Sequence, residues 1–198
     1  MGKREIVRSF ICIDLPSDIK RSIYGFVSEA KKLDSSVKWV EEQNLHLTLK
    51  FLGEEPVTKV DKIRNLLSKM IPNLKLSSFR LTLKGFGVFP DWNRPRVIWL
   101  GIEGEGVGQL KILRDFIEAE ARKLDFVKDS KSFSPHITLG RAKSGKISSM
   151  LRAYLEERND MFLGEFMVGD VILMKSHLLP RGPVYTPIAI FPLKGGQE

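Results

Sequence analysis

The sequence places the same His-apolar-Thr-apolar unit in each half of the chain, at positions 46–49 and 136–139. Side chains of an extended strand alternate between two faces, so each unit carries its histidine and threonine on one face and its apolar residues on the other. The chain has only three histidines, and the units hold two of them, His46 and His136, ninety positions apart. Two such strands lying side by side would present two imidazoles and two hydroxyls together.

The predicted elements around the two units follow the same order. Each half reads as a helix, a His-Thr strand, a second helix and two further strands. His46 precedes Arg96 by fifty residues, and His136 precedes Tyr185 by forty-nine. This order indicates a duplication and favours an α+β fold of two packed, pseudo-symmetric αβ lobes over a doubly wound parallel sheet. We expect residues 1–198 to form a single bilobal domain.

The boundaries of these elements follow from apolar periodicity and from proline and glycine positions. Strands are predicted at 5–14, 37–41, 45–53, 75–85, 95–102, 133–141, 162–175 and 184–192. Helices are predicted from 17 to 33, from 57 to 71, from the glycine-rich turn at 101–108 to 124, and from 146 to 157. An aromatic loop with one proline is predicted at 86–92.

Net charge and cysteine content indicate which kind of partner and which cellular compartment to expect. Lys and Arg exceed Asp and Glu by eight, which favours an anionic partner, nucleic acid first, although a solvated basic surface is the alternative. Cys12 is the single cysteine and lies in an apolar run, so we expect no intrachain disulfide and a reduced, cytoplasmic setting. No apolar stretch approaches the ~20 residues of a membrane span, and the short mixed run after Lys3 and Arg4 does not predict a signal peptide.

The residue types of the duplicated unit suit acid–base chemistry at phosphorus. Histidine has an ordinary pKa of about 6.5, so one imidazole can donate a proton while the other accepts one. In-line displacement at one phosphorus would place the imidazoles about 6–7 Å apart, and threonine hydroxyls can donate to the non-bridging oxygens. This chemistry needs no metal and no cofactor. A single unit could equally be a half-buried strand histidine beside a threonine, but the duplication favours the catalytic interpretation.

Four further residues could flank the histidines. Lys50 shares strand parity with His46, so it could bind the substrate phosphate or be a solvated lysine. Arg141 has the wrong parity for a phosphate contact unless a bulge, or the end of the strand at Gly140, redirects it. Arg8 and Phe10 share one face of the first strand and could border the site.

The remaining candidates carry weaker signals. Phe86, Phe89 and Trp92 could stack on a base of single-stranded RNA, or could hold their loop against the domain. His177 lacks a following Thr and is predicted to be a loop residue. The stretch 140–146 imitates a phosphate-binding loop, but its Ser/Thr position is isoleucine and it overlaps the second unit, so we dismiss it.

The segments at 8–13, 46–53, 96–101 and 134–141 together resemble a known family. They are similar to the two-histidine (2H) phosphoesterase superfamily, and within it to the RNA 2′,3′-cyclic phosphodiesterases, also called 2′-5′ RNA ligases of the LigT/ThpR type. The similarity runs over nearly the whole chain. It implies antiparallel sheets that face a central cleft, with helices on the outside, and a substrate RNA ending in a 2′,3′-cyclic phosphate, such as a tRNA fragment.

The resemblance also implies residue roles. His46 would protonate the departing 3′ oxygen, and His136 would take the proton from the attacking water, leaving a 2′-phosphomonoester. Thr48 and Thr138 would hold the phosphate oxygens. Some relatives also join RNA ends through a 2′-5′ linkage. We expect a monomer, and the alternatives are a phosphodiesterase for 2′-5′ oligonucleotides or small cyclic nucleotides, or a non-catalytic RNA-binding module.

Overall fold

The computed structural model describes residues 5–129, 132–180 and 182–195. The strands are β1 (Ile6–Asp14), β2 (Val37–Trp39), β3 (His46–Pro56), β4 (Phe79–Phe89), β5 (Val97–Glu103), β6 (His136–Ala142), β7 (Phe162–Val168), β8 (Asp170–Leu179) and β9 (Gly182–Pro192). The helices are α1 (Ser17–Leu33), α2 (Val57–Met70), α3 (Val107–Lys123) and α4 (Ser149–Glu156). None of the described helices is long and apolar enough to cross a membrane.

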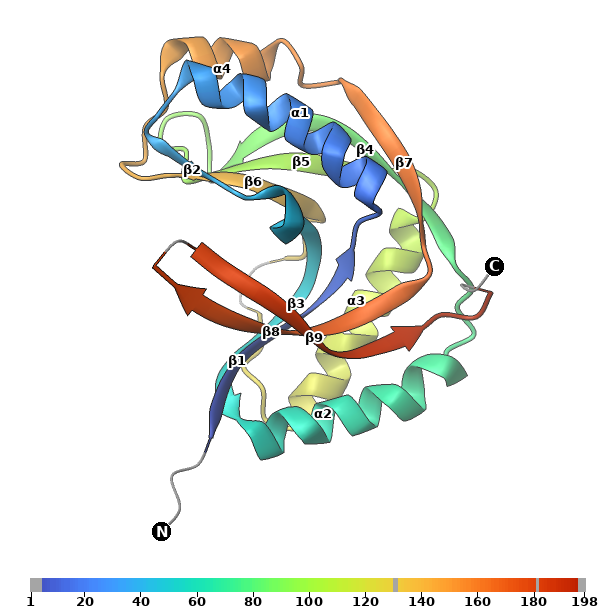
Figure 1. The fold of residues 1–198 in the computed structure, drawn as a ribbon. Helices are drawn as coiled ribbons and strands as arrows, with labels where there is room; N and C mark the ends of the chain where they lie inside the picture. The colour runs from blue at the N-terminus through green and yellow to red at the C-terminus, as the bar shows by residue number, and fades with distance from the viewer. Residues whose placement is uncertain (1–4, 130–131, 181, 196–198) are drawn as a thin grey trace.

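The strands form one curled sheet in the order β7-β4-β5-β6-β3-β1-β8-β9, with β2 added beside β6 (Figure 1). Every paired strand runs antiparallel to its neighbour. The two motif strands, β3 and β6, are the central pair, and the sheet continues from them by three strands on either side. The predicted α+β fold of two pseudo-symmetric lobes is therefore confirmed, and the two lobes share a continuous sheet.

The helices cover one face of this sheet in an exchanged arrangement. α1 follows β1 in the chain, yet it packs with α4 against the lobe that contains β4 and β7. α3 follows β5, yet it packs with α2 against the lobe that contains β1 and β3, as Figure 1 shows. The amphipathic pattern of α1 makes this packing possible, because its apolar residues recur at helical spacing and are buried.

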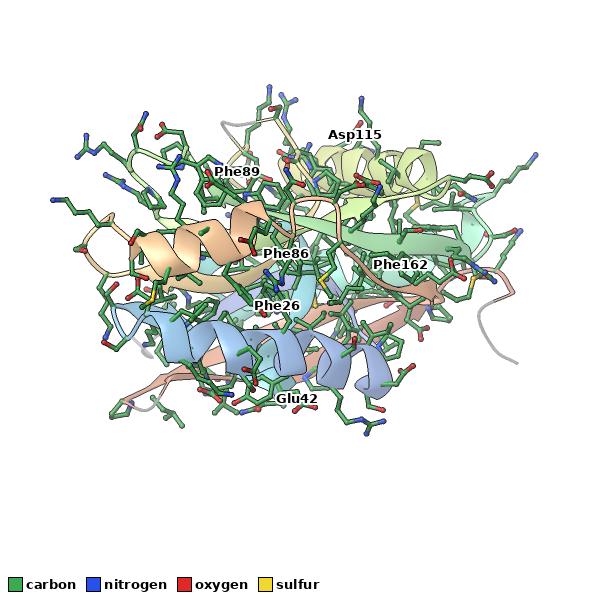
Figure 2. All side chains as sticks on the ribbon, turned by 90° about the horizontal axis from the view of Figure 1, so that it is seen from above. Phe26, Glu42, Phe86, Phe89, Asp115 and Phe162 are labelled. Carbon is green, nitrogen blue, oxygen red and sulfur yellow. The ribbon has the colours of Figure 1, made fainter. Side chains whose placement is uncertain are left out.

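Aromatic stacking marks the contact between α1 and the sheet. Phe26 on α1 stacks on Phe86 of β4 with ring centroids 3.9 Å apart, and both rings lie in the core (Figure 2). Phe86 therefore cannot stack on a base, and the predicted loop at 86–92 begins later, because Phe86 to Phe89 continue β4.

Two other sequence predictions need correction. The predicted strand 162–175 is two strands, because the chain leaves β7, which pairs with β4, and enters β8, which pairs with β1 in the other lobe. His177 is not a loop residue, since it lies in β8 opposite Val184 of β9. The long β8–β9 hairpin extends further than the apolar pattern indicated, because its outer end is exposed and has no apolar alternation to mark it.

Candidate active site

The two His-Thr units lie side by side at the centre of the sheet. Leu47 of β3 pairs with Ile137 of β6, and both side chains are fully buried on the helix side. In the described residues this pair alone makes up the β3–β6 ladder, and the histidine and threonine on either side of it in each strand project to the opposite face. The face that carries these four residues is called the motif face below.

Both imidazoles are held by the same backbone contact. Nδ1 of His46 lies 2.7 Å from the carbonyl oxygen of Asn44, and Nδ1 of His136 lies 2.7 Å from the carbonyl oxygen of Ser134. A carbonyl oxygen can only accept a hydrogen bond, so Nδ1 carries a proton in each ring and Nε2 is left for chemistry. Sequence reasoning missed this contact, although in both halves the carbonyl belongs to the second residue before the histidine.

The first unit contains an internal hydrogen bond. Thr48 Oγ1 lies 3.0 Å from Nε2 of His46. With Nδ1 protonated, a neutral His46 accepts this bond from the threonine hydroxyl. When His46 is protonated, Nε2–H donates instead, and the threonine proton becomes available to a phosphate oxygen. The contact therefore links the charge of the imidazole to the direction in which Thr48 donates.

Aromatic rings enclose the imidazoles on the motif face. Phe10 lies 4.8 Å from the His46 ring, and Tyr185 meets the same ring edge-on at 5.3 Å. Phe89 meets the His136 ring edge-on at 5.0 Å, and Figure 2 labels it at the end of β4. The prediction that Phe10 borders the site is confirmed. Tyr185 was missed as a site residue, although its spacing from the second histidine had marked it as a repeat position.

This enclosure changes the protonation of both histidines. Burial lowers the pKa of His46 below its ordinary value, while the Asn44 carbonyl and the Asp14 carboxylate act in the opposite direction. Burial also lowers the pKa of His136, and the charge of Arg141 lowers it further. Both imidazoles are therefore mainly neutral at pH 7 in the protein alone. A bound phosphodiester anion would raise both pKa values, because it favours the protonated form.

Lys50 does not lie on the motif face, which corrects the sequence prediction. Ile11 of β1 pairs with Lys50 while Cys12 pairs with Thr48, so the residue between them, Leu49, forms a bulge that reverses the alternation. Lys50 is 1% exposed, and its Nζ lies 2.8 Å from Glu118 Oε2 on α3. Phe51, the next residue of β3, is exposed and takes the position on the motif face that Lys50 was expected to hold.

An equivalent bulge occurs in β6, and it turns the side chain of Arg141 toward the motif face. Ile98 pairs with Gly140 while Trp99 pairs with Thr138, so Leu139 is the extra residue. The bulge returns Arg141 to the motif face, where it is exposed and lowers the pKa of His136. The bulge, one of the two ways in which Arg141 was expected to reach this face, is therefore present, and its contact with phosphate stays a prediction.

Two outer candidates have other partners. Arg8 pairs with Glu54 of β3 at 3.5 Å, and it lies in β1 two residues before Phe10, whose ring contacts both His46 and Tyr185. Trp92 packs against the core and beneath the guanidinium of Arg152, 5.6 Å from the ring centroid. Trp92 therefore holds its loop, which was the alternative to base stacking. Within the described ranges, no three His, Cys, Asp or Glu side chains are grouped closely enough to hold a metal ion.

The duplicated architecture matches a family of known proteins. The model of the LigT-like phosphoesterase family matches residues 13–99 and again residues 100–185, one match for each His-Thr unit. The chain belongs to the LigT-like phosphoesterase family. The resemblance inferred from the sequence is thereby confirmed, and the enzyme class is that of the phosphoesterases.

Individual LigT-like relatives agree over nearly their whole length. A protein of Methanothermobacter thermautotrophicus, named RNA 2′,3′-cyclic phosphodiesterase, is 32% identical over 187 residues, covering 94% of this chain and 99% of its own. One of Methanocaldococcus jannaschii with the same name is 35% identical, covering 92% and 98%. A crystal structure from Thermus thermophilus has a TM-score of 0.77 at 29% identity, covering 95% and 98%. E. coli LigT complexed with 3′-AMP has a TM-score of 0.75 at 26% identity, covering 96% and 99%.

Proposed function

We propose that this protein hydrolyses a 2′,3′-cyclic phosphate at the end of an RNA, leaving a 2′-phosphomonoester and a free 3′ hydroxyl. The observation that carries the proposal is the pair of imidazoles on adjacent central strands, each with Nδ1 bound to a backbone carbonyl and Nε2 left for chemistry. The names of the relatives from archaea and bacteria supply the substrate.

The proposed reaction uses one imidazole at each end of an in-line displacement. His136 Nε2 accepts a proton from water as the water oxygen forms a bond to phosphorus. The bond from phosphorus to the 3′ oxygen breaks, and His46, protonated beside the phosphate anion, gives its Nε2 proton to that oxygen. Thr48, Thr138 and Arg141 stabilise the negative charge that develops on the non-bridging oxygens. The two histidines end in exchanged protonation states, and solvent restores them.

The same groups support 2′-5′ joining of RNA ends. An RNA 5′ hydroxyl would replace water as the attacking group, and the bond to the 3′ oxygen would again break. The product would be a 2′-5′ phosphodiester. Neither histidine would need to change its role.

The test is incubation of the protein, in EDTA, with an oligoribonucleotide that ends in a 2′,3′-cyclic phosphate. Conversion to a 2′-phosphate end is expected, with a loss of about 10²–10⁴ in rate for His46→Ala and for His136→Ala. His177→Ala is the matched control. This third histidine is exposed and lies in β8 opposite Val184, outside the two His-Thr units, so its loss should leave the rate unchanged.

Other results would redirect the proposal. Turnover only of 2′-5′ oligonucleotides or of small cyclic nucleotides would replace the substrate and keep the chemistry. RNA binding without turnover of any of these would establish a binding module. Full activity in either histidine variant would exclude the two-histidine mechanism.

The oligomeric state and the cellular compartment are also proposed. We infer that the chain acts as one bilobal, monomeric unit in the cytoplasm. Both histidines come from the same chain, so a second copy is not needed to complete the site. The single cysteine, Cys12, is buried in the sheet, which is compatible with a reducing compartment.

A further inference from the structure

A basic pocket adjoins the motif face where β6 ends. It has a volume of about 420 Å³ and lies between the loop that follows β4 and the turn that follows β6. Its lining includes Arg94, Arg96, Arg141 and Lys143, and no acidic residue. Arg141 belongs both to this pocket and to the surroundings of His136, whose pKa it lowers. Because the bulge in β6 also puts Arg141 on the motif face, the pocket and the proposed catalytic site have this side chain in common.

A fifth cation faces the pocket region from β2. Lys38 pairs directly with Arg141 across the β2–β6 ladder, and both side chains are exposed. Like charges directly opposite each other in an antiparallel pair destabilise the sheet. The fold therefore keeps an arrangement that costs stability unless an anion lies between the two side chains.

Carboxylates do not neutralise these five cations. Within the described residues, none of the five forms an ion pair. Asp91, in the same loop as Arg94, accepts hydrogen bonds from the backbone N–H groups of Asn93 and Arg94 at 2.8 and 3.1 Å. Asp34 likewise accepts from the backbone N–H groups of Ser36 and Ser148. These carboxylates are bound to backbone N–H groups and leave the cations to an external partner.

We propose that this basic pocket binds the phosphodiester backbone of the RNA strand that leads to the cyclic end. The inference rests on the proposed function, because a cyclic phosphate is the 3′ terminus and all other nucleotides lie on its 5′ side. Arg141 stands three residues beyond Thr138 along β6, and the bulge at Leu139 shortens this span to less than about 10 Å. A mononucleotide has one phosphate, and that phosphate is held at the histidines. An oligonucleotide has further phosphates that reach the pocket, so the protein prefers oligonucleotide ends to cyclic mononucleotides.

The test compares the two substrates in one variant. The double substitution Arg94→Ala/Arg96→Ala should lower kcat/KM for a cyclic-phosphate oligoribonucleotide by about 10-fold or more, chiefly through KM. The loss for a 2′,3′-cyclic mononucleotide should be less than about three-fold. Salt should weaken oligonucleotide binding with a logarithmic slope of about −0.7 per phosphate contact, and the variant should have the shallower slope. Arg122→Ala, at an exposed position on α3, is the matched control.

The outcomes separate this proposal from the hydrolase proposal. Equal losses on both substrates, or no loss on the oligonucleotide, would overturn the proposal that the pocket binds RNA. Activity of the unmodified protein on the mononucleotide would still support the hydrolase proposal. If the unmodified protein turns over neither substrate, the hydrolase proposal fails. Fluorescence anisotropy with a labelled single-stranded RNA that ends in a 3′-phosphate then decides the pocket alone. Weaker binding in the double variant supports it, and equal binding overturns it.

Discussion

Leu47 lies directly opposite Ile137, and this pair joins the two lobes at the centre of the sheet. Both side chains are fully buried among the core residues behind the motif strands. Strand alternation therefore directs their neighbours, the histidines and threonines, to the motif face. A slip of either strand by one residue would turn its histidine and threonine toward the helices, so burial of the apolar residues also fixes the face that carries the two units.

The threonines should contribute less than the histidines. Thr48→Val and Thr138→Val retain the side-chain shape but remove the donor to the phosphate oxygens, so we expect each to lower kcat by up to about 10². Thr48→Ser and Thr138→Ser restore a hydroxyl and should recover most of the rate. Single-turnover rates measure the effect on the chemical step. A valine loss equal to that of His46→Ala would contradict the assignment of the threonines as supporting groups.

The pH dependence should be bell-shaped and should differ between kcat/KM and kcat. On the acid side His136 must lose its proton, and on the alkaline side His46 must keep its proton. The free protein governs kcat/KM, and burial lowers the pKa of both histidines, so the optimum of kcat/KM should fall below pH 6.5. The bound phosphate anion should move the kcat optimum to higher pH. A kcat/KM profile that is flat between pH 5 and 8 would contradict two-histidine catalysis.

Tyr185 should act on His46 through its ring. Tyr185→Ala removes the edge-on contact and admits water, so we expect the pKa of His46 to rise toward its ordinary value of about 6.5. Tyr185→Phe keeps the ring and should leave that pKa nearly unchanged. NMR titration of the imidazole protons measures both variants. Equal shifts in the two variants would show that the hydroxyl, and not the ring, sets the environment of His46.

Lys50 should be a stability residue. Its ammonium group is buried beside Glu118 and also donates to the carbonyl oxygen of Val127 at 2.9 Å. Burial alone would raise the pKa of Glu118, but the Lys50 hydrogen bond and charge and the Arg114 charge outweigh it and lower that pKa. Lys50→Met leaves the carboxylate without its closest partner, so we expect a loss of about 3–5 kcal/mol in the free energy of unfolding.

A surface ion pair supplies the control for this prediction. Lys32→Met breaks a 2.7 Å contact with Glu29 between two exposed side chains and should cost only about 0–1 kcal/mol. Urea unfolding measures both variants. If Lys50→Met cost no more than Lys32→Met, the buried pair would not stabilise the fold. A loss of activity in Lys50→Met without a loss of stability would instead support the original expectation of a substrate contact.

Sequence periodicity predicted the parts of the site that depend only on alternation. Alternation within one short strand predicts that His46 and Thr48 share a face, and it predicts the same for His136 and Thr138. The structure confirms both predictions. Alternation fails after the bulges at Leu49 and Leu139, because an extra residue reverses the face. Lys50 was therefore placed on the wrong face, while Arg141 needed the bulge in order to reach the motif face.

The remaining site features depend on contacts between distant segments. Tyr185 reaches His46 only because β8 crosses to the other lobe and β9 folds back beside it. Asn44 is anchored by its amide, which donates to the carbonyl oxygen of Pro183 at 2.9 Å. Neither relationship has a local signal in the sequence, since each joins positions about 140 residues apart.

The exchange of α1 and α3 between lobes gives the molecule the geometry of a twofold dimer whose subunits have been fused. In a true dimer of identical chains, the two imidazoles would have identical surroundings, and each substitution would change both of them. Fusion removes that constraint. Here position 51 is phenylalanine where the second half has Arg141, and Lys50 corresponds to Gly140. In a symmetric dimer only the bound substrate could distinguish the two histidines, whereas a single fused chain lets separate substitutions adjust the surroundings of each one.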